Sequence, residues 1–189
     1  MKTNNDLARC EWCTQDDIYI KYHDLEWGVP LHDDQKLFEL LSLEGAQAGL
    51  SWLTVLKKRP GYRTAFNNFN INQVSKFKDS KINELINNPE IIRNKLKVNS
   101  VVKNALGVLQ IQKEFGSFDE YLWRYVGYKP IDNKGTQNPR AVDISNQLSK
   151  DLKKRGMNFI GPTICYAFMQ SNGMINDHAL NCYRYKQLL

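Results

Sequence analysis

The sequence predicts an all-α protein, and three observations lead to that fold class. Apolar side chains recur at a spacing of three and four residues along most of the chain, which is the period of a helix with one buried face. Capping residues and glycines delimit these periodic segments. No run of alternating apolar and polar residues is long enough to predict a half-buried strand.

The first two thirds of the chain contain the clearest helical patterns. Residues 34–43 place their leucines on one face, and residues 95–115 repeat apolar side chains up to Gly116, a residue suited to end a helix. Ser117 begins a capping-box pattern that opens a further helix over 118–126. These local signals predict where the helices begin and end.

The last third is predicted to contain two helices joined by a tight turn. Asp143 is placed to cap the first helix, and residues 155–161 form a hairpin before Pro162 opens the second. Residues 128–140 are rich in Gly, Pro, Asn and Lys and form the longest loop. We therefore expect residues 1–189 to form one unit of two helical lobes, with an internal boundary in 128–140.

Composition and charge narrow the class of protein. The 189-residue chain is 42% hydrophobic, enough for a real core, yet no apolar run approaches membrane-spanning length. Four cysteines without a signal peptide are typical of a reducing interior, so we expect a cytoplasmic protein. The formal charge of +6 is clustered at 57–59, 93–97 and 150–155, which suits a phosphate backbone or, alternatively, the solvated ends of helices. Nothing indicates a heptad seam, so we expect a monomer.

The predicted hairpin has features of a phosphate-binding turn. Gly156 and Gly161 would let the backbone approach a phosphate closely, and the free amides of the next helix could donate to it. Lys153, Lys154 and Arg155 would supply positive charge. An ordinary corner between two helices remains the alternative, since glycines are common in such turns.

Four possible metal ligands lie at opposite ends of the chain. His178 and Cys182 are spaced so that one helical turn would direct both at a single ion, and Cys10 and His23 could complete a tetrahedral zinc set. One zinc ion bound by all four would join the two ends. The alternative is that the thiols are ordinary buried groups and that the histidines are satisfied by hydrogen bonds.

Glu44 is the most unusual charged residue in the sequence. It follows Leu40 and Leu41 at helical spacing, so a carboxylate falls on the apolar face and needs a partner or a purpose. Aromatic faces around one carboxylate would suit a flat cationic ligand, whereas the alternative is a plain aromatic core. The aromatic residues near it in the sequence are Trp12, Tyr19, Tyr22, Trp27 and Trp52.

Several long motifs carry a resemblance to a known family. Residues 10–12 (CEW), 22–30 (YHDLEWGVP), 43–52 (LEGAQAGLSW), 161–166 (GPTICY) and 176–178 (NDH) make the chain similar to the DNA-3-methyladenine glycosylase I family. The similarity covers nearly the whole chain. It implies an all-helical helix-hairpin-helix enzyme that flips N3-methyladenine out of double-stranded alkylated DNA and excises it in base excision repair.

The resemblance also implies roles for individual residues. Glu44 and Tyr22 would hydrogen-bond the extruded base among the aromatic side chains, and Gly49 and Leu50 would fill the gap left in the duplex. One structural Zn²⁺ would join the two ends of the chain. Its implied ligands are Cys10, His23, His178 and Cys182, whereas the nearby Cys13 falls outside the ligand positions.

Two further features of the sequence bear on the chemistry of the reaction. A lysine early in the second hairpin helix would be needed for lyase activity, and none lies between Pro162 and Asp177, so we expect simple hydrolysis. Asp177 is a second catalytic candidate, but it could instead orient the adjacent His178 on the metal. Two other functions remain open: a non-catalytic DNA-binding module, and a glycosylase for another alkylated or oxidised base.

Overall fold

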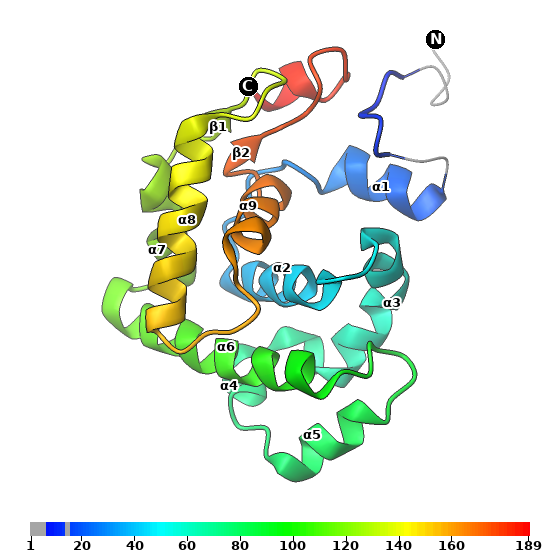
Figure 1. Cartoon of the computed structure of the whole chain (residues 1–189), viewed down its shortest axis with the longest axis vertical. Coiled ribbons are helices and arrows are strands. Elements are labelled where there is room, and N and C mark those ends of the chain that lie inside the picture. Colours follow the sequence, from blue (N-terminus) through cyan, green and yellow to red (C-terminus); the bar gives the residue numbers. More distant parts are fainter. Residues whose placement is uncertain (1–6, 14–15) are drawn as a thin grey trace.

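The computed structural model describes residues 7–13 and 16–189, and helices dominate this part of the chain (Figure 1). The prediction of a mainly helical fold is therefore confirmed. The α-helices are α1 (Asp17–Leu25), α2 (Asp34–Gln47), α3 (Trp52–Ala65), α4 (Ile71–Val74), α5 (Asp79–Ile86), α6 (Lys95–Phe115), α7 (Phe118–Trp123), α8 (Pro139–Lys154) and α9 (Pro162–Ser171).

Short elements connect the helices. A parallel pair of two-residue strands joins the loop before α8 to the segment after α9, a feature that the sequence did not predict because two residues cannot show an alternating pattern. The strands are β1 (Ile131–Asp132) and β2 (Ile175–Asn176), and the 3₁₀ segments are η2 (Asn67–Phe69), η3 (Arg124–Val126) and η4 (Tyr185–Leu188).

The helix ends test the capping predictions. Helix α6 has the predicted bounds and ends at Gly116, whose φ of 89° is left-handed. Ser117 caps α7 as predicted, its hydroxyl accepting from the Glu120 amide at 2.9 Å. The predicted start of α8 at Asp143 was wrong. That helix begins at Pro139, because the Asn138 side chain accepts from the Arg140 amide and a proline is favourable in the first turn.

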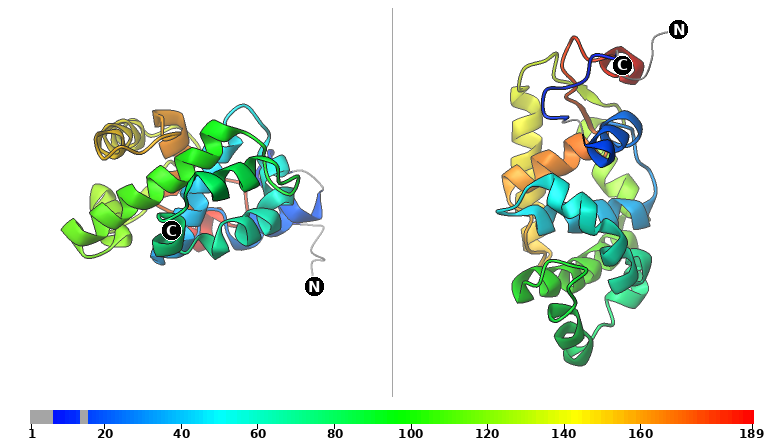
Figure 2. Two further views of the ribbon diagram at one scale, coloured as in Figure 1. Left: turned by 90° about the horizontal axis from the view of Figure 1, so that it is seen from below. Right: turned by 90° about the vertical axis from the view of Figure 1, so that its right-hand side faces the viewer.

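Helix α2 lies in the middle of the molecule. It contacts α9 on one side, α6 on the other and α3 near its end, and it extends to Gln47, beyond the predicted 34–43. Its leucines Leu37 and Leu41 are fully buried. The right-hand view of Figure 2 shows that residues 7–13 and the C-terminal segment lie at the same end of the molecule. The fold thus surrounds the helix that carries Glu44, and it brings residues 7–13 into contact with the C-terminal segment.

Within the described residues, no helix is both long and apolar enough to cross a membrane.

Candidate active site and metal centre

A cavity of about 290 Å³ opens between α1, the ends of α2 and α3, and α9. The structure brings together in its wall all the residues that we predicted for a base pocket. Asp177 also lies in the wall, and so do three residues that we did not predict. The lining residues are Trp12, Tyr19, Tyr22, Trp27, Glu44, Gln47, Trp52, Ala167, Gln170 and Asp177.

The aromatic walls of the cavity are held in place by one another. Trp12 meets Tyr19 and Trp27 edge to face, with ring centroids 5.5 and 4.9 Å apart. Tyr22 lies against Trp52 with centroids at 5.4 Å. Contacts of this geometry stabilise ring positions beyond the area they bury, so the cavity is formed before any ligand enters. The Trp52 indole N–H is buried without an acceptor among the described residues, which leaves it available to a ligand.

Glu44 lines the cavity and is only 3% exposed. Burial raises the pKa of this carboxyl to about 8, although a hydrogen bond with Ser171 acts in the opposite direction. Burial and then the charge of Glu44 raise the pKa of Tyr22 well above its usual value. In the empty cavity at neutral pH the carboxyl is therefore mostly protonated, and a bound cation would favour its ionised form.

This shifted pKa predicts how stability varies with pH. Because the folded protein holds a proton on Glu44 up to about pH 8 and the unfolded chain loses it near 4.5, the stabilisation is full below 4.5 and is lost as the pH rises through 8. Relative to Glu44→Gln, the free energy of unfolding of the wild type should fall by about 1.4 kcal/mol per pH unit between these values. Urea unfolding of both proteins across this range checks the prediction, and parallel pH profiles would contradict it.

Two glutamines in the cavity wall were missed in the sequence. Gln47 lies one helical turn after Glu44 on α2 and so shares its face, which is a signal that could have identified it. Gln170, on α9, donates from Nε2 to Asp177 Oδ2. No local pattern marks Gln170, because its role depends on a residue that the chain brings back after a turn.

Asp177 is held in the cavity wall by hydrogen bonds. Its Oδ1 accepts from Asn133 Nδ2 at 2.6 Å, and the same amide nitrogen lies 2.7 Å from the Tyr166 hydroxyl. Asn133 comes from the loop that we predicted only as a boundary. The suggested contact of Asp177 with the His178 ring is not seen, since that ring directs Nε2 to the Trp27 carbonyl at 3.2 Å.

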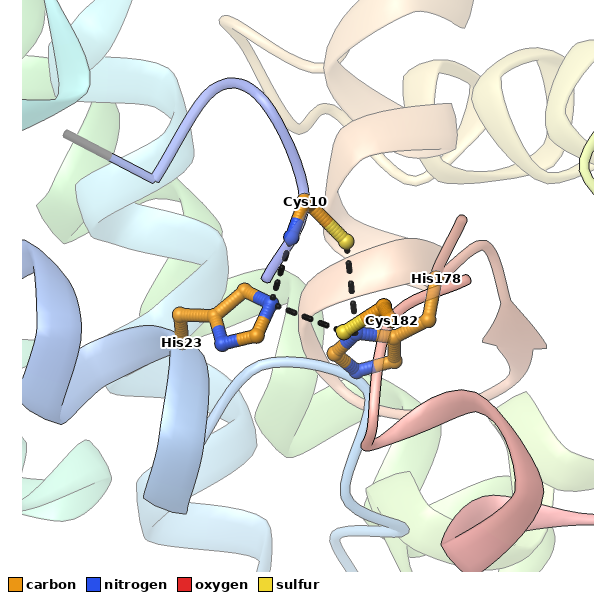
Figure 3. A group of neighbouring side chains, drawn as sticks. All are labelled: Cys10, His23, His178 and Cys182. Atoms are coloured by element: carbon orange, nitrogen blue, oxygen red, sulfur yellow. Dashed lines mark hydrogen bonds between the residues drawn. The ribbon is translucent and has the colours of Figure 1, made fainter. Parts of the chain in front are cut away.

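The four predicted metal ligands converge in a second, buried site, which Figure 3 shows in close view. One ligand atom from each of Cys10, His23, His178 and Cys182 lies within 4.8 Å of the other three. Asp24 Oδ1 accepts from His23 Nδ1 at 2.8 Å, which leaves Nε2 directed at the Cys182 sulfur. Carboxylates and carbonyls that orient histidines in this way are typical of metal sites.

The distances fit a tetrahedral ion. The Cys182 sulfur lies 3.4 Å from His23 Nε2 and 3.5 Å from His178 Nδ1, and the Cys10 sulfur lies 3.5 Å from the same His178 atom. Zinc bond lengths and tetrahedral angles place sulfur and nitrogen ligands roughly 3.6 Å apart. Burial also lowers the pKa of His178 to about 4, so its imidazole is neutral, as a ligand must be.

One detail of the metal prediction was wrong. We expected His178 and Cys182 to lie on one helical turn, but α9 ends at Ser171 and the left-handed Gly173, with a φ of 79°, stops its continuation. The two ligands instead lie in an irregular segment, in which the Cys182 amide donates to the Ala179 carbonyl at 2.8 Å. The four side chains converge as predicted although the local structure differs.

The residues predicted to face DNA lie in the turn after α2 and in the segment that connects α8 to α9. Gly49, with a φ of 75°, turns the chain after α2, and the following Leu50 is 40% exposed. At the hairpin, Gly156 has a φ of 80°, whereas Gly161 has an ordinary φ of −61° and serves as the N-cap of α9. A Cβ at Gly49, Gly156 or Gly161 would meet no atom within 4 Å, so the surface at each is open.

The basic residues before the hairpin divide into two groups. Lys153 and Lys154 are exposed. Arg155 instead donates to Glu114 at 2.6 Å and lies over the Phe115 and Tyr121 rings. Its guanidinium therefore binds α6 and α7 to the end of α8, a long-range arrangement that the basic cluster in the sequence does not reveal.

Comparisons with known proteins agree with this geometry. The model of the methyladenine glycosylase family matches residues 12–185. DNA-3-methyladenine glycosylase 1 of Escherichia coli K12 is 43% identical over 182 residues, which are 95% of this chain and 97% of that protein. A DNA-3-methyladenine glycosylase of Haemophilus influenzae Rd is 47% identical over 178 residues, covering 93% and 96% of the two chains.

Solved structures show the same fold. A crystal structure of a 3-methyladenine DNA glycosylase I superposes with a TM-score of 0.87 at 42% identity, covering 93% of this chain and 98% of that one. The Staphylococcus aureus enzyme, solved to explain 3-methyladenine recognition, gives a TM-score of 0.86 at 38% identity, covering 93% and 95%. With a family model over nearly its whole length and relatives of this identity, the chain belongs to the methyladenine glycosylase family.

Proposed function

We propose that this protein is a monofunctional DNA glycosylase that flips N3-methyladenine out of alkylated duplex DNA and releases it by hydrolysis, in base excision repair. The observation that carries the proposal is the buried carboxyl of Glu44 in a preformed aromatic cavity. A non-catalytic DNA-binding module has no use for such a group. The named activities of the relatives support the same conclusion.

The charge of the lesion explains why this cavity suffices. N3-methyladenine in DNA is cationic, so its glycosidic bond is weak and the base leaves without needing a proton. A site that accepts the cation and favours the positive charge that develops on the sugar can do most of the work. Neutral adenine would gain little from Glu44, and it also costs more to unstack than a damaged base.

Roles for the individual residues follow from their positions. Glu44 and Tyr22 hydrogen-bond the extruded base, and Trp12, Tyr19, Trp27 and Trp52 enclose its faces and edges. Asp177 also lines the cavity, and we propose that it faces the sugar and stabilises positive charge there. We rank its contribution below that of Glu44.

The DNA backbone would bind at the turn between α8 and α9, which we propose is a helix-hairpin-helix. The exposed Lys153 and Lys154 supply the charge, and the open N-terminus of α9 at Gly161 supplies amide donors. We assign no phosphate contact to Arg155, because Glu114 and Asp151 already bind it. The half-exposed Leu50 fills the gap that the flipped base leaves.

The metal that fits the buried site best is one structural Zn²⁺, held by Cys10, His23, His178 and Cys182. Two thiolates and two imidazoles are its preferred ligands, and a set of four leaves no open position for a water molecule. The ion would hold the segment with Trp12 and the α1 helix against the C-terminal segment. Its proposed role is to shape the cavity, while the chemistry belongs to the residues around Glu44.

A release assay tests the proposed function. We expect the protein, acting as a monomer, to liberate free 3-methyladenine from methylated duplex DNA and to leave abasic sites unbroken, because no lysine lies between Pro162 and Asp177 to attack the sugar. Chromatography of the released bases from DNA that carries 3-methyladenine, 7-methylguanine and oxidised purines measures the outcome. Release of another base in preference to 3-methyladenine would contradict the proposal.

A further inference from the structure

Helix α6 carries a buried lysine that binds the end of α2. Lys97 is 8% exposed, and its ammonium donates to the carbonyls of Ala46 and Ala48 at 2.8 and 2.6 Å. Burial lowers the pKa of this amine, so the ion is held there against a cost in solvation. A buried cation with two such short contacts points to a specific role.

The two carbonyls are ones that the turn after α2 leaves without a backbone donor. The Gly45 carbonyl accepts from the Ala48 amide and the Gln47 carbonyl accepts from the Leu50 amide at 2.7 Å. The carbonyls that alternate with these, those of Ala46 and Ala48, receive the Lys97 ammonium instead, which also suits the negative end of the α2 dipole. Lys97 thus holds the turn that presents Leu50, which we call the tip turn (residues 48–51).

The same face of α6 holds the hairpin in a similar way. Asn104, 2% exposed, donates from Nδ2 to the Asn158 carbonyl at 3.0 Å and accepts at Oδ1 from the Asn158 amide at 2.8 Å. One helical turn after Asn104, Met157 of the hairpin packs on Gly107. A Cβ added at Gly107 would lie only 2.5 Å from the Met157 Cγ. The hairpin backbone is therefore docked on α6 at one defined place.

The contacts of Lys97 and Asn104 fix the distance between the tip turn and the hairpin. Lys97 and Asn104 are two helical turns apart on one face of α6, which is about 10.5 Å along the helix axis. The hairpin also touches the helix that leads into the tip turn, since a Cβ at Gly45 of α2 would lie 3.2 Å from the Phe159 carbonyl. The tip turn, the hairpin and the helix that carries Glu44 form one rigid unit built on α6.

We propose that Lys97 and Asn104 are positioning residues that hold the tip turn and the hairpin at a fixed spacing, so that DNA bound by the hairpin meets Leu50 at the lesion. The inference rests on the proposed function, because it assigns both elements to DNA. It concerns DNA engagement and not the affinity of the cavity for the base, since neither side chain lines that cavity.

Two binding measurements on the full-length protein test this. In Lys97→Met and in Asn104→Ala we expect the Kd for a duplex with a tetrahydrofuran abasic analogue to rise about tenfold or more. The reason is that the tip turn and the hairpin can then no longer contact the DNA in their correct positions at the same time. Binding of free 3-methyladenine, followed by tryptophan fluorescence, should stay within about twofold of wild type. Lys113→Met, an exposed cation on the same helix, is the matched control and should change neither.

Further variants separate positioning from general support of the fold. Lys97→Arg should retain part of the DNA affinity that Lys97→Met loses. Leu50→Ala should reduce the DNA affinity by a smaller factor in the Lys97→Met background than in wild type, because the tip turn is already misplaced there. If Lys97→Met does not fold, Lys97→Gln, which keeps a neutral donor, takes its place in both measurements.

Three results would overturn the inference: unchanged DNA affinity, parallel loss of free-base binding, or full additivity with Leu50→Ala. Failure of the wild type to release 3-methyladenine would instead count against the proposed function.

Discussion

Replacing Glu44 with glutamine is expected to reduce release of 3-methyladenine from methylated DNA by about a hundredfold or more, while the protein becomes more stable at neutral pH. The two effects share one cause. Burial makes the ionised carboxylate unfavourable in the empty cavity, with a pKa raised to about 8, and the cationic lesion is the partner that favours its charge. Glutamine keeps the shape and removes the charge, so it loses the electrostatic part of base release.

Single-turnover release at saturating enzyme measures this change. Glu39→Gln is the matched control, since it makes the same substitution on α2 at a residue that pairs with Arg63 outside the cavity. Asp177→Asn is the companion variant and should reduce the rate of release less than Glu44→Gln does. Normal release of 3-methyladenine by Glu44→Gln would show that the charge of Glu44 is not needed for catalysis. Full activity of Asp177→Asn with an intact fold would restrict Asp177 to a structural role.

Loss of the metal is the second large effect that we expect. Cys182→Ser should abolish stoichiometric zinc binding and lower the thermal midpoint by about 10 °C or more, because a structural zinc site contributes directly to folding free energy. The ion would be the main link between the N-terminal segment, through Cys10, and the C-terminal segment, through Cys182. Without it the wall that includes Trp12 loses its support.

Metal analysis and thermal unfolding, with and without a chelator, measure this effect. Cys13→Ser is the matched control, since this cysteine lies close to Cys10 in the chain but outside the ligand set, and it should retain both zinc and stability. The zinc proposal would be ruled out if the wild-type protein were purified without metal and its thermal midpoint did not change on addition of the chelator. A chelated protein that keeps its fold but loses release would show that the metal acts closer to the reaction.

Local signals in the sequence account for much of the helical framework. Gly116 and Ser117 mark a helix end and a helix start that need no tertiary contact, since a left-handed residue and a capping hydroxyl act within one turn. The start of α8 was predicted at Asp143, but the helix begins at Pro139. Asn138 followed by Pro139 is the stronger local signal for a helix start. Glu44 could be singled out because helical periodicity places it among leucines.

The sequence by itself determined the helical class, the acidic residue on an apolar face and, through a resemblance, the four candidate metal ligands. Only the tertiary structure decided which groups those residues meet. Asn133 reaches Asp177 from a loop 44 residues away in the sequence, Gln170 reaches it across the turn after α9, and Arg155 turns from the hairpin to Glu114. Helix periods and caps act over a few residues, whereas a side chain's partner depends on how distant segments pack, which no local pattern records.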